Sequence, residues 1–107
     1  MATSTMANPN EVTYVNPSKL DASVWTGGSI ALRKCNGIVQ VKLEGVVFAA
    51  ITERRSFAQC PEGYRPLTES YFKDNSGITI LISADGVMKT EVSSARTTWG
   101  TGMFIAG

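Results

Sequence analysis

The chain has 107 residues, with ten Lys plus Arg against nine Asp plus Glu, and it contains no histidine. Its length fits one domain, and a formal net charge of +1 argues against a dedicated nucleic-acid or membrane-surface binder, which would need clustered positive charge. Without histidine, a single chain has no His general base, no Ser-His or Cys-His nucleophile pair and no His-ligated metal. We therefore expect neither a cofactor nor a metal site.

The two cysteines, Cys35 and Cys60, form no Cys-x-x-Cys pair, and their spacing leaves open whether they are bonded to each other. We favour two reduced thiols, because cysteine is also a common small buried residue. The longest apolar run, residues 46–51, is far shorter than the roughly 18 residues of a membrane-spanning helix. The start, MATSTMANPN, has neither the basic nor the apolar region of a signal peptide. We expect no membrane insertion.

Alternation with a period of two recurs along the chain, whereas helical periodicity is almost absent. Residues 1–11 are small and polar and predict a flexible arm, followed by a single domain over residues 12–107. A short first strand is expected at 12–15, and residues 18–28 are expected to form a loop with one helical turn at 19–22. The other predicted strands span residues 29–34, 38–44, 46–51, 67–73, 78–82, 87–92 and 99–106.

Two dipeptides predict tight hairpins in this series. Asn36-Gly37 lies between two alternating segments and is the stronger signal, because a type I′ turn needs positive φ at both central residues. Asp85-Gly86 predicts a second hairpin. The alternation after the first hairpin turns one set of side chains inward: Val39, Val41 and Leu43.

Gly45 interrupts this alternation and predicts a bulge or a sharp bend. The fully apolar segment 46–51 predicts a strand buried on both faces, against a core on one side and another subunit on the other. Seven or eight short strands separated by turns favour an all-β fold, either an antiparallel β-barrel or a jelly-roll-like sandwich.

Four segments follow one another in an order that resembles a known family: IALRKCNGIVQVKLEGVVF, CPEGYRPLTESYF, ITILISADGVMKTEV and WGTGMFIAG. The order resembles the carboxy-terminal head domain of phage receptor-binding proteins, which lies at the tips of tail and baseplate spikes in phages of Gram-positive bacteria. The resemblance covers roughly residues 20–107. Its matching positions are Arg33-Lys34, Asn36-Gly37, Pro61 to Pro66, Ile80, Ile82, Asp85-Gly86 and Val87.

The resemblance implies a trimeric β-barrel head that binds saccharides or glycerol-phosphate polymers of the host cell wall. It also implies a virion protein of the tail tip or baseplate, made in the host cytoplasm. Its partners would be two further copies of itself, the host saccharide and other tail or baseplate proteins on its amino-terminal side. We expect a non-enzymatic adhesion module, with no nucleic acid as a partner.

Four residues are candidates for ligand contact. Trp99 and Trp25 offer the faces on which a sugar ring stacks, although tryptophan also fills cores and subunit contacts. Arg65, between Tyr64 and Pro66, either turns the chain at a corner or grips a phosphate or carboxylate with its guanidinium. Tyr71, on the predicted strand 67–73, is the fourth candidate.

Other functions stay open at this point. A purely structural, trimerising tail-fibre domain would have the same fold without a ligand. A small polysaccharide depolymerase would need two carboxylates facing one cleft, here contributed by different subunits, because the acidic residues are scattered along the chain. The run Glu53-Arg54-Arg55 is interpreted as a solvated sheet edge or as a contact for an anionic wall polymer.

Overall fold

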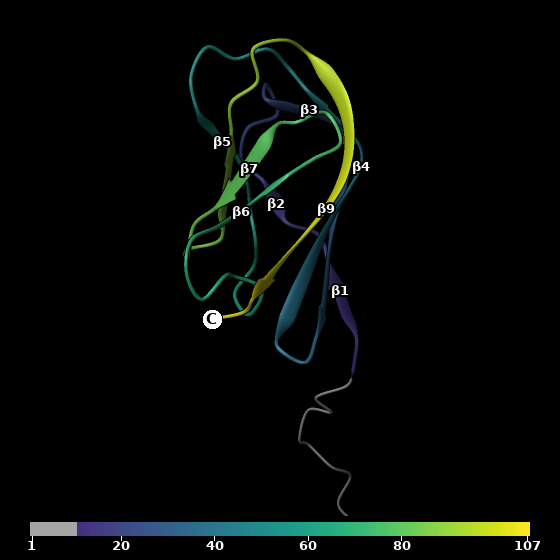
Figure 1. Cartoon of the computed structure of the whole chain (residues 1–107), viewed down its shortest axis with the longest axis vertical. Coiled ribbons are helices and arrows are strands. Elements are labelled where there is room, and N and C mark those ends of the chain that lie inside the picture. Colours follow the sequence, from purple (N-terminus) through teal and green to yellow (C-terminus); the bar gives the residue numbers. More distant parts are fainter. Residues whose placement is uncertain (1–10) are drawn as a thin grey trace, which may run out of the picture.

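The structure is a computed structural model that describes residues 11–107, so the predicted arm lies outside the described residues except for Glu11. Two antiparallel sheets pack face to face (Figure 1). The first sheet has the order β1-β3-β4-β9, formed by Thr13–Val15, Trp25–Cys35, Ile38–Phe48 and Arg96–Ile105. The second has the order β2-β5-β8-β7-β6, formed by Ser18–Lys19, Arg55–Gln59, Val87–Thr90, Thr79–Ile82 and Ser70–Lys73.

Both predicted hairpins are confirmed. Asn36 and Gly37 have φ values of 54° and 73°, and they join β3 to β4 with Cys35 opposite Ile38. Such paired positive φ angles match the right-handed twist of the flanking strands. Gly86, with φ of 86°, lies in the turn between β7 and β8.

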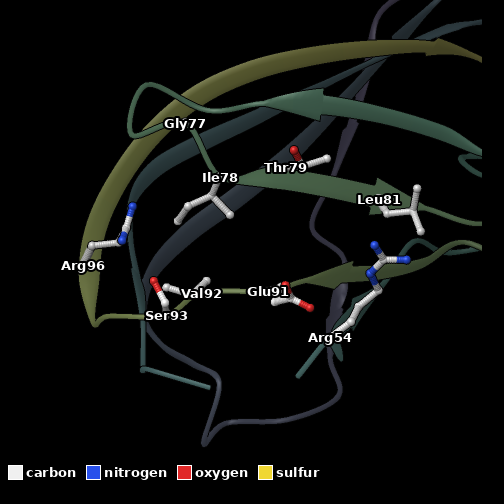
Figure 2. Close-up of a pocket in the computed structure, with 9 residues that line it drawn as sticks. All are labelled: Arg54, Gly77, Ile78, Thr79, Leu81, Glu91, Val92, Ser93 and Arg96. Carbon is white, nitrogen blue, oxygen red and sulfur yellow. The ribbon is translucent and has the colours of Figure 1, made fainter. Parts of the chain in front are cut away.

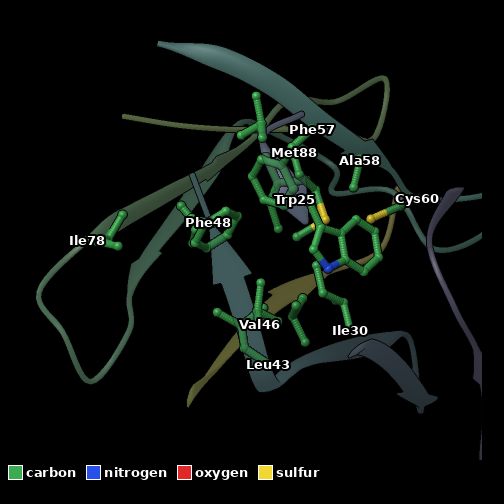
Figure 3. Packing of buried hydrophobic residues seen from close by; sticks show 14 of the residues in the cluster. Trp25, Ile30, Leu43, Val46, Phe48, Phe57, Ala58, Cys60, Ile78 and Met88 are labelled. Carbon is green, nitrogen blue, oxygen red and sulfur yellow. The ribbon is translucent and has the colours of Figure 1, made fainter. Parts of the chain in front are cut away.

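The core lies between the two sheets and is made of alternating side chains from both (Figure 3). The three inward positions predicted on β4 are confirmed as buried. The rings of Phe48 on β4 and Phe57 on β5 meet edge to face at 5.0 Å and join the sheets at the centre. This arrangement suits the ring quadrupole and adds to the area that each ring buries. The other large side chains that are fully buried are Ile30, Leu32, Leu43, Ile80, Ile82 and Met88.

The all-β class is confirmed, since residues 11–107 contain no helix, and the arrangement is a sandwich and not a closed barrel. The number of strands in this part of the chain is nine, above the expected seven or eight. Gly45 marks the predicted bulge, with φ of 59° and a register shift between Leu43 and Val46, but the strand continues through it to Phe48.

The structure accounts for the apolar character of residues 46–51 largely within one chain. Val46, Phe48 and Ile51 are buried in the core of their own chain, and Val47 is already half-buried beside Gly27 and Thr97. The segment therefore leaves no large apolar side chain exposed, and it does not need a second subunit to cover it.

Several strand boundaries differ from the predictions for identifiable reasons. The 18–28 segment includes β2 and the start of β3, with a helical turn in which the amide of Trp25 donates to the carbonyl of Asp21. The strand β5 was missed because a bulge between Ser56 and Ala58 breaks its alternation. Instead of extending β6, the amide of Leu67 donates to Ile105 at the end of β9.

No disulfide joins Cys35 to Cys60 within the described chain, and Cys60 is fully buried. Burial raises the pKa of the Cys60 thiol from an ordinary value of 9.0 to about 11, against a smaller lowering by Arg65. The folded state holds this proton more tightly than the unfolded state. The protonated Cys60 thiol therefore contributes fully to the stability of the folded state below pH 9, and this contribution is lost as the pH rises toward 11.

We expect wild-type protein to lose about 1 kcal/mol more stability than Cys60→Ala between pH 9 and pH 10. Urea unfolding of both proteins at pH 8, 9 and 10 measures this difference, and the variant cancels the titration of all other groups. Parallel pH profiles for the two proteins would contradict the prediction.

Candidate functional site

A hollow of about 390 Å³ opens where β7 and β8 separate (Figure 2). Their pairing ends at Ile80 and Thr90. Beyond that point the two segments no longer bond to each other. The carbonyl of Ile78 accepts from the amide of Asp74, and the carbonyl of Val92 accepts from the amide of Ile51 at 2.7 Å. The hollow is lined by Arg54, Gly77, Ile78, Thr79, Leu81, Glu91, Val92, Ser93 and Arg96.

The turn at residues 74–78 forms one wall of the hollow, and Asp74 holds it in place. Oδ1 of Asp74 accepts from the amide of Ser76 at 2.9 Å, from its hydroxyl at 2.8 Å and from the amide of Ile78 at 2.9 Å. Such a side chain replaces the bonds of a regular strand and fixes the turn. Asp74 is only 8% exposed, so the side chain that fixes this turn is itself buried.

Two arginines of the hollow differ in how they are held. Arg96 donates from Nη2 to the hydroxyl of Ser94 at 2.8 Å, from Nε to its carbonyl at 3.2 Å and from Nη1 to the carbonyl of Ser76 at 3.5 Å. Arg54 is exposed, and no hydrogen bond or ion pair holds its guanidinium within residues 11–107. The hollow therefore has one fixed cation and one that is free to adapt.

Figure 2 places Arg96 and Arg54 toward opposite ends of the hollow, with Ser93 and Glu91 between them. Glu91 is exposed and is the one carboxylate of the lining in the described part of the chain. Paired-carboxylate hydrolysis at this place would need a second acid from another copy. Hydrogen-bonding and charged groups therefore dominate the rim, and Ile78, Leu81 and Val92 supply apolar surface.

The structure places Trp25 in the core, where it is only 5% exposed. Its indole Nε1 donates to the carbonyl of Gly27 at 3.0 Å, its ring meets Phe57 edge to face, and Nζ of Lys19 lies 4.6 Å from the ring centroid. These contacts account for the residue through packing, which was one of its two interpretations.

Arg65 lies at a corner of the chain. Its Nε donates to the carbonyl of Cys60 at 3.0 Å, and its own carbonyl accepts from Gly107. Its side chain covers Gly86, where an added Cβ would lie 2.8 Å from its Cγ. Arg65 thus contacts Cys60, Gly86 and Gly107, three points that are far apart in the sequence, as expected for a residue at a corner of the chain.

Trp99 and Tyr71 are exposed, at 52% and 73%, but on different sheets. Trp99 lies on the outer face of β9 beside Gly45. Tyr71 is the cross-strand partner of Leu81, which lines the hollow, so Tyr71 lies beside it on the outer face of the second sheet. The four predicted residues do not meet in one site, and Tyr71 alone adjoins the hollow.

The sequence singled out Arg54 but not Arg96. Arg96 follows a polar stretch without a motif, and its place in the hollow depends on the separation of β7 and β8, which the local sequence does not show.

No helix among residues 11–107 is long and apolar enough to span a membrane. No protein-family model matches the chain, and a search of curated proteins finds no match either.

Proposed function

We propose that this chain is a non-enzymatic adhesion module that binds a saccharide or a glycerol-phosphate polymer of the host cell wall, as a head at the tail tip or baseplate of a virion. The observation that carries the binding role is the hollow at the place where β7 and β8 of the second sheet separate. It combines some apolar surface with charged and hydroxyl groups that can form hydrogen bonds with a polar ligand such as a carbohydrate. The virion setting rests on the family resemblance of the sequence.

Tyr71 extends this site along the sheet. Directly paired residues of antiparallel strands have Cβ atoms about 5 Å apart, so the ring of Tyr71 borders the surface around Leu81. An exposed aromatic face beside a polar hollow suits a sugar ring that stacks on one side and forms hydrogen bonds on the other.

The same proposal includes a homotrimer, formed through the outer face of the first sheet. Ile38 of β4 and Ile105 of β9 are cross-strand partners, and Met103 lies two residues from Ile105 on the same face. Their exposed fractions are 47%, 65% and 68%. Closed threefold symmetry would bury this apolar cluster in every copy and present three hollows on one head.

The test is co-sedimentation of the protein with purified cell walls of Gram-positive bacteria, before and after their polysaccharides are removed. We expect retention only on walls that carry polysaccharide. Tyr71→Ala should weaken binding of a retained oligosaccharide about fivefold, as expected for about 1 kcal/mol of stacking.

Tyr14→Ala is the matched control for oligosaccharide affinity, because Tyr14 is 70% exposed on β1 of the other sheet. Tyr14 shares a cross-strand row with Met103 of the proposed trimer surface, so the comparison uses a short oligosaccharide that one subunit binds alone. The variant should bind like wild type. Retention that ignores the removal of polysaccharide would contradict the proposal, and a trimer that binds no wall would favour the purely structural function.

A further inference from the structure

The ladder between β7 and β8 stops one hydrogen-bonded pair early. Such pairs alternate with non-bonded pairs along antiparallel strands, and at the turn the amide of Ser83 donates to the carbonyl of Val87. The same register makes Thr79 and Glu91 a bonded pair, four residues further from the turn on each strand. Within residues 11–107, however, no hydrogen bond joins Thr79 to Glu91, because the strands have separated there and the hollow has opened.

Both residues direct their backbone groups into the hollow. The carbonyl of Thr79 points toward β8, because Oγ1 of Thr90 donates to it at 3.0 Å, and the amide of a strand residue points to the same side as its carbonyl. The carbonyl of Val92 points away from β7, since it accepts from Ile51, so the preceding residue, Glu91, points toward β7. The hollow is therefore bordered by two facing backbone edges, each with an amide that is not used in the ladder.

An extended polypeptide matches these edges. It carries N–H and C=O groups on both of its sides at the spacing of a strand, so it can pair with Thr79 on one side and Glu91 on the other. The pairing of Ile80 with Thr90 closes the hollow at one end. A polypeptide that enters from the open end cannot pass between the paired strands, so the part that inserts is a chain end.

The charge at the closed end favours a carboxyl terminus over an amino terminus. Arg55 is the register partner of Thr90, so Arg54 adjoins the point where the hollow closes. Figure 2 shows Arg54 at the end of the hollow where Leu81 lies, and Arg96 toward the opposite end. Arg54 is exposed and forms no hydrogen bond or ion pair within residues 11–107. Its guanidinium can therefore turn toward a carboxylate and donate two hydrogen bonds to it.

We propose that the hollow captures the carboxyl-terminal end of an extended polypeptide, whose backbone pairs with Thr79 and Glu91 and whose terminal carboxylate pairs with Arg54. This goes beyond the proposed function, because it gives the hollow a protein ligand that would compete with the wall polymer. The exposed carboxylate of Glu91 opposes the terminal charge, so Glu91 contributes through its backbone and not through its side chain.

The probe is a fluorescein-labelled pentapeptide of alternating valine and threonine with a free carboxyl terminus, and fluorescence anisotropy measures its binding. The same peptide with an amidated terminus should bind about tenfold more weakly, the usual size of one charge-assisted contact. Methylation of the last two backbone nitrogens should also weaken binding about tenfold, because it removes donors to the two edges. Methylation of the first nitrogen alone is the matched control and should have no effect. Equal binding of all four peptides, or no binding of the first, would overturn the inference.

Three substitutions test the individual groups. Arg54→Gln should weaken binding of the free acid about tenfold and abolish the difference between acid and amide. Arg33→Gln makes the same charge change at an exposed position on β3 of the other sheet, and it should keep that difference. Glu91→Gln retains the backbone and should bind the free acid several-fold more tightly. An Arg54→Gln protein that still prefers the free acid would contradict the place given to the carboxylate.

Amide hydrogen exchange, followed by nuclear magnetic resonance, tests the backbone pairing directly. In the free protein the amides of Thr79 and Glu91 should exchange faster than the amide of Ile51, which donates to Val92. A saturating concentration of the pentapeptide should slow both. Slow exchange of the two amides in the free protein would overturn the inference. If a wall oligosaccharide slows them and the peptide does not, the protein ligand is refuted and the proposed function stands. Peptide binding without retention on cell walls would refute the proposed function alone.

Discussion

Gly28→Ala is expected to destabilise the domain by more than 3 kcal/mol, enough to unfold much of a small protein. Gly28 has φ of 78°, and a Cβ there would lie 2.0 Å from the carbonyl oxygen of Gly45 and 2.6 Å from the Cα of Val46. These atoms are backbone and cannot rotate away. The bulges of β3 and β4 meet at this point, so the clash would push apart the two central strands of the first sheet.

Gly37→Ala is the matched control for this prediction. Its φ of 73° is nearly the same, but an added Cβ would meet nothing within 4 Å. It should cost about 1 to 2 kcal/mol, the penalty of a left-handed backbone alone. Urea unfolding followed by tryptophan fluorescence measures both variants. Equal losses of stability would show that the close approach of the two strands contributes nothing beyond the φ angle.

The parts of the fold that the sequence predicted are those governed by local chemistry. The Asn36-Gly37 turn is specified by its own residues, and the inward side of β4 follows from strict alternation. The strand β5 was not predicted, because the bulge places Phe57 and Ala58 next to each other in the core. A bulge of this kind depends on pairing with a distant strand, which the local pattern does not contain.

The candidate site likewise combines residues that the local sequence identifies with an arrangement that only the tertiary structure creates. Local sequence identified exposed aromatic and basic residues one at a time, and Tyr71 and Arg54 are two that lie at or beside the hollow. The association of Arg54 with Arg96 requires the β7–β8 pairing to stop at Thr90, and it requires the turn that Asp74 anchors. Both are consequences of tertiary structure.

Ile105→Asp is expected to convert the proposed trimer into a folded monomer. The side chain of Ile105 is 65% exposed in the single chain, so the substitution should change the free energy of unfolding of the monomer by no more than about 0.5 kcal/mol. In the trimer the new carboxylate would be buried beside Ile38 and Met103 without a partner, which costs several kcal/mol in each copy. Sedimentation equilibrium at micromolar concentration measures the change.

Two further variants separate assembly from folding. Tyr71→Asp places the same charge at an exposed position of the other sheet and should leave the trimer intact. Val47→Asp should lower stability before it affects assembly, because Val47 is half-buried against Gly27 within its own chain. A wild-type protein that sediments as a monomer, or an Ile105→Asp protein that remains a trimer, would contradict this choice of surface.

The loss of assembly should appear in wall binding as a loss of avidity. Arg96, which lines the hollow, and Ile105 lie at opposite ends of β9, so the monomeric variant should bind a short oligosaccharide with unchanged affinity. Retention on a polymer that engages three hollows at once should fall by about 10² to 10⁴, because multivalency raises avidity without new contacts. Parallel losses for oligosaccharide and polymer would instead show that Ile105 supports the site itself. Unchanged retention of a monomeric variant would show that one hollow is sufficient for adhesion.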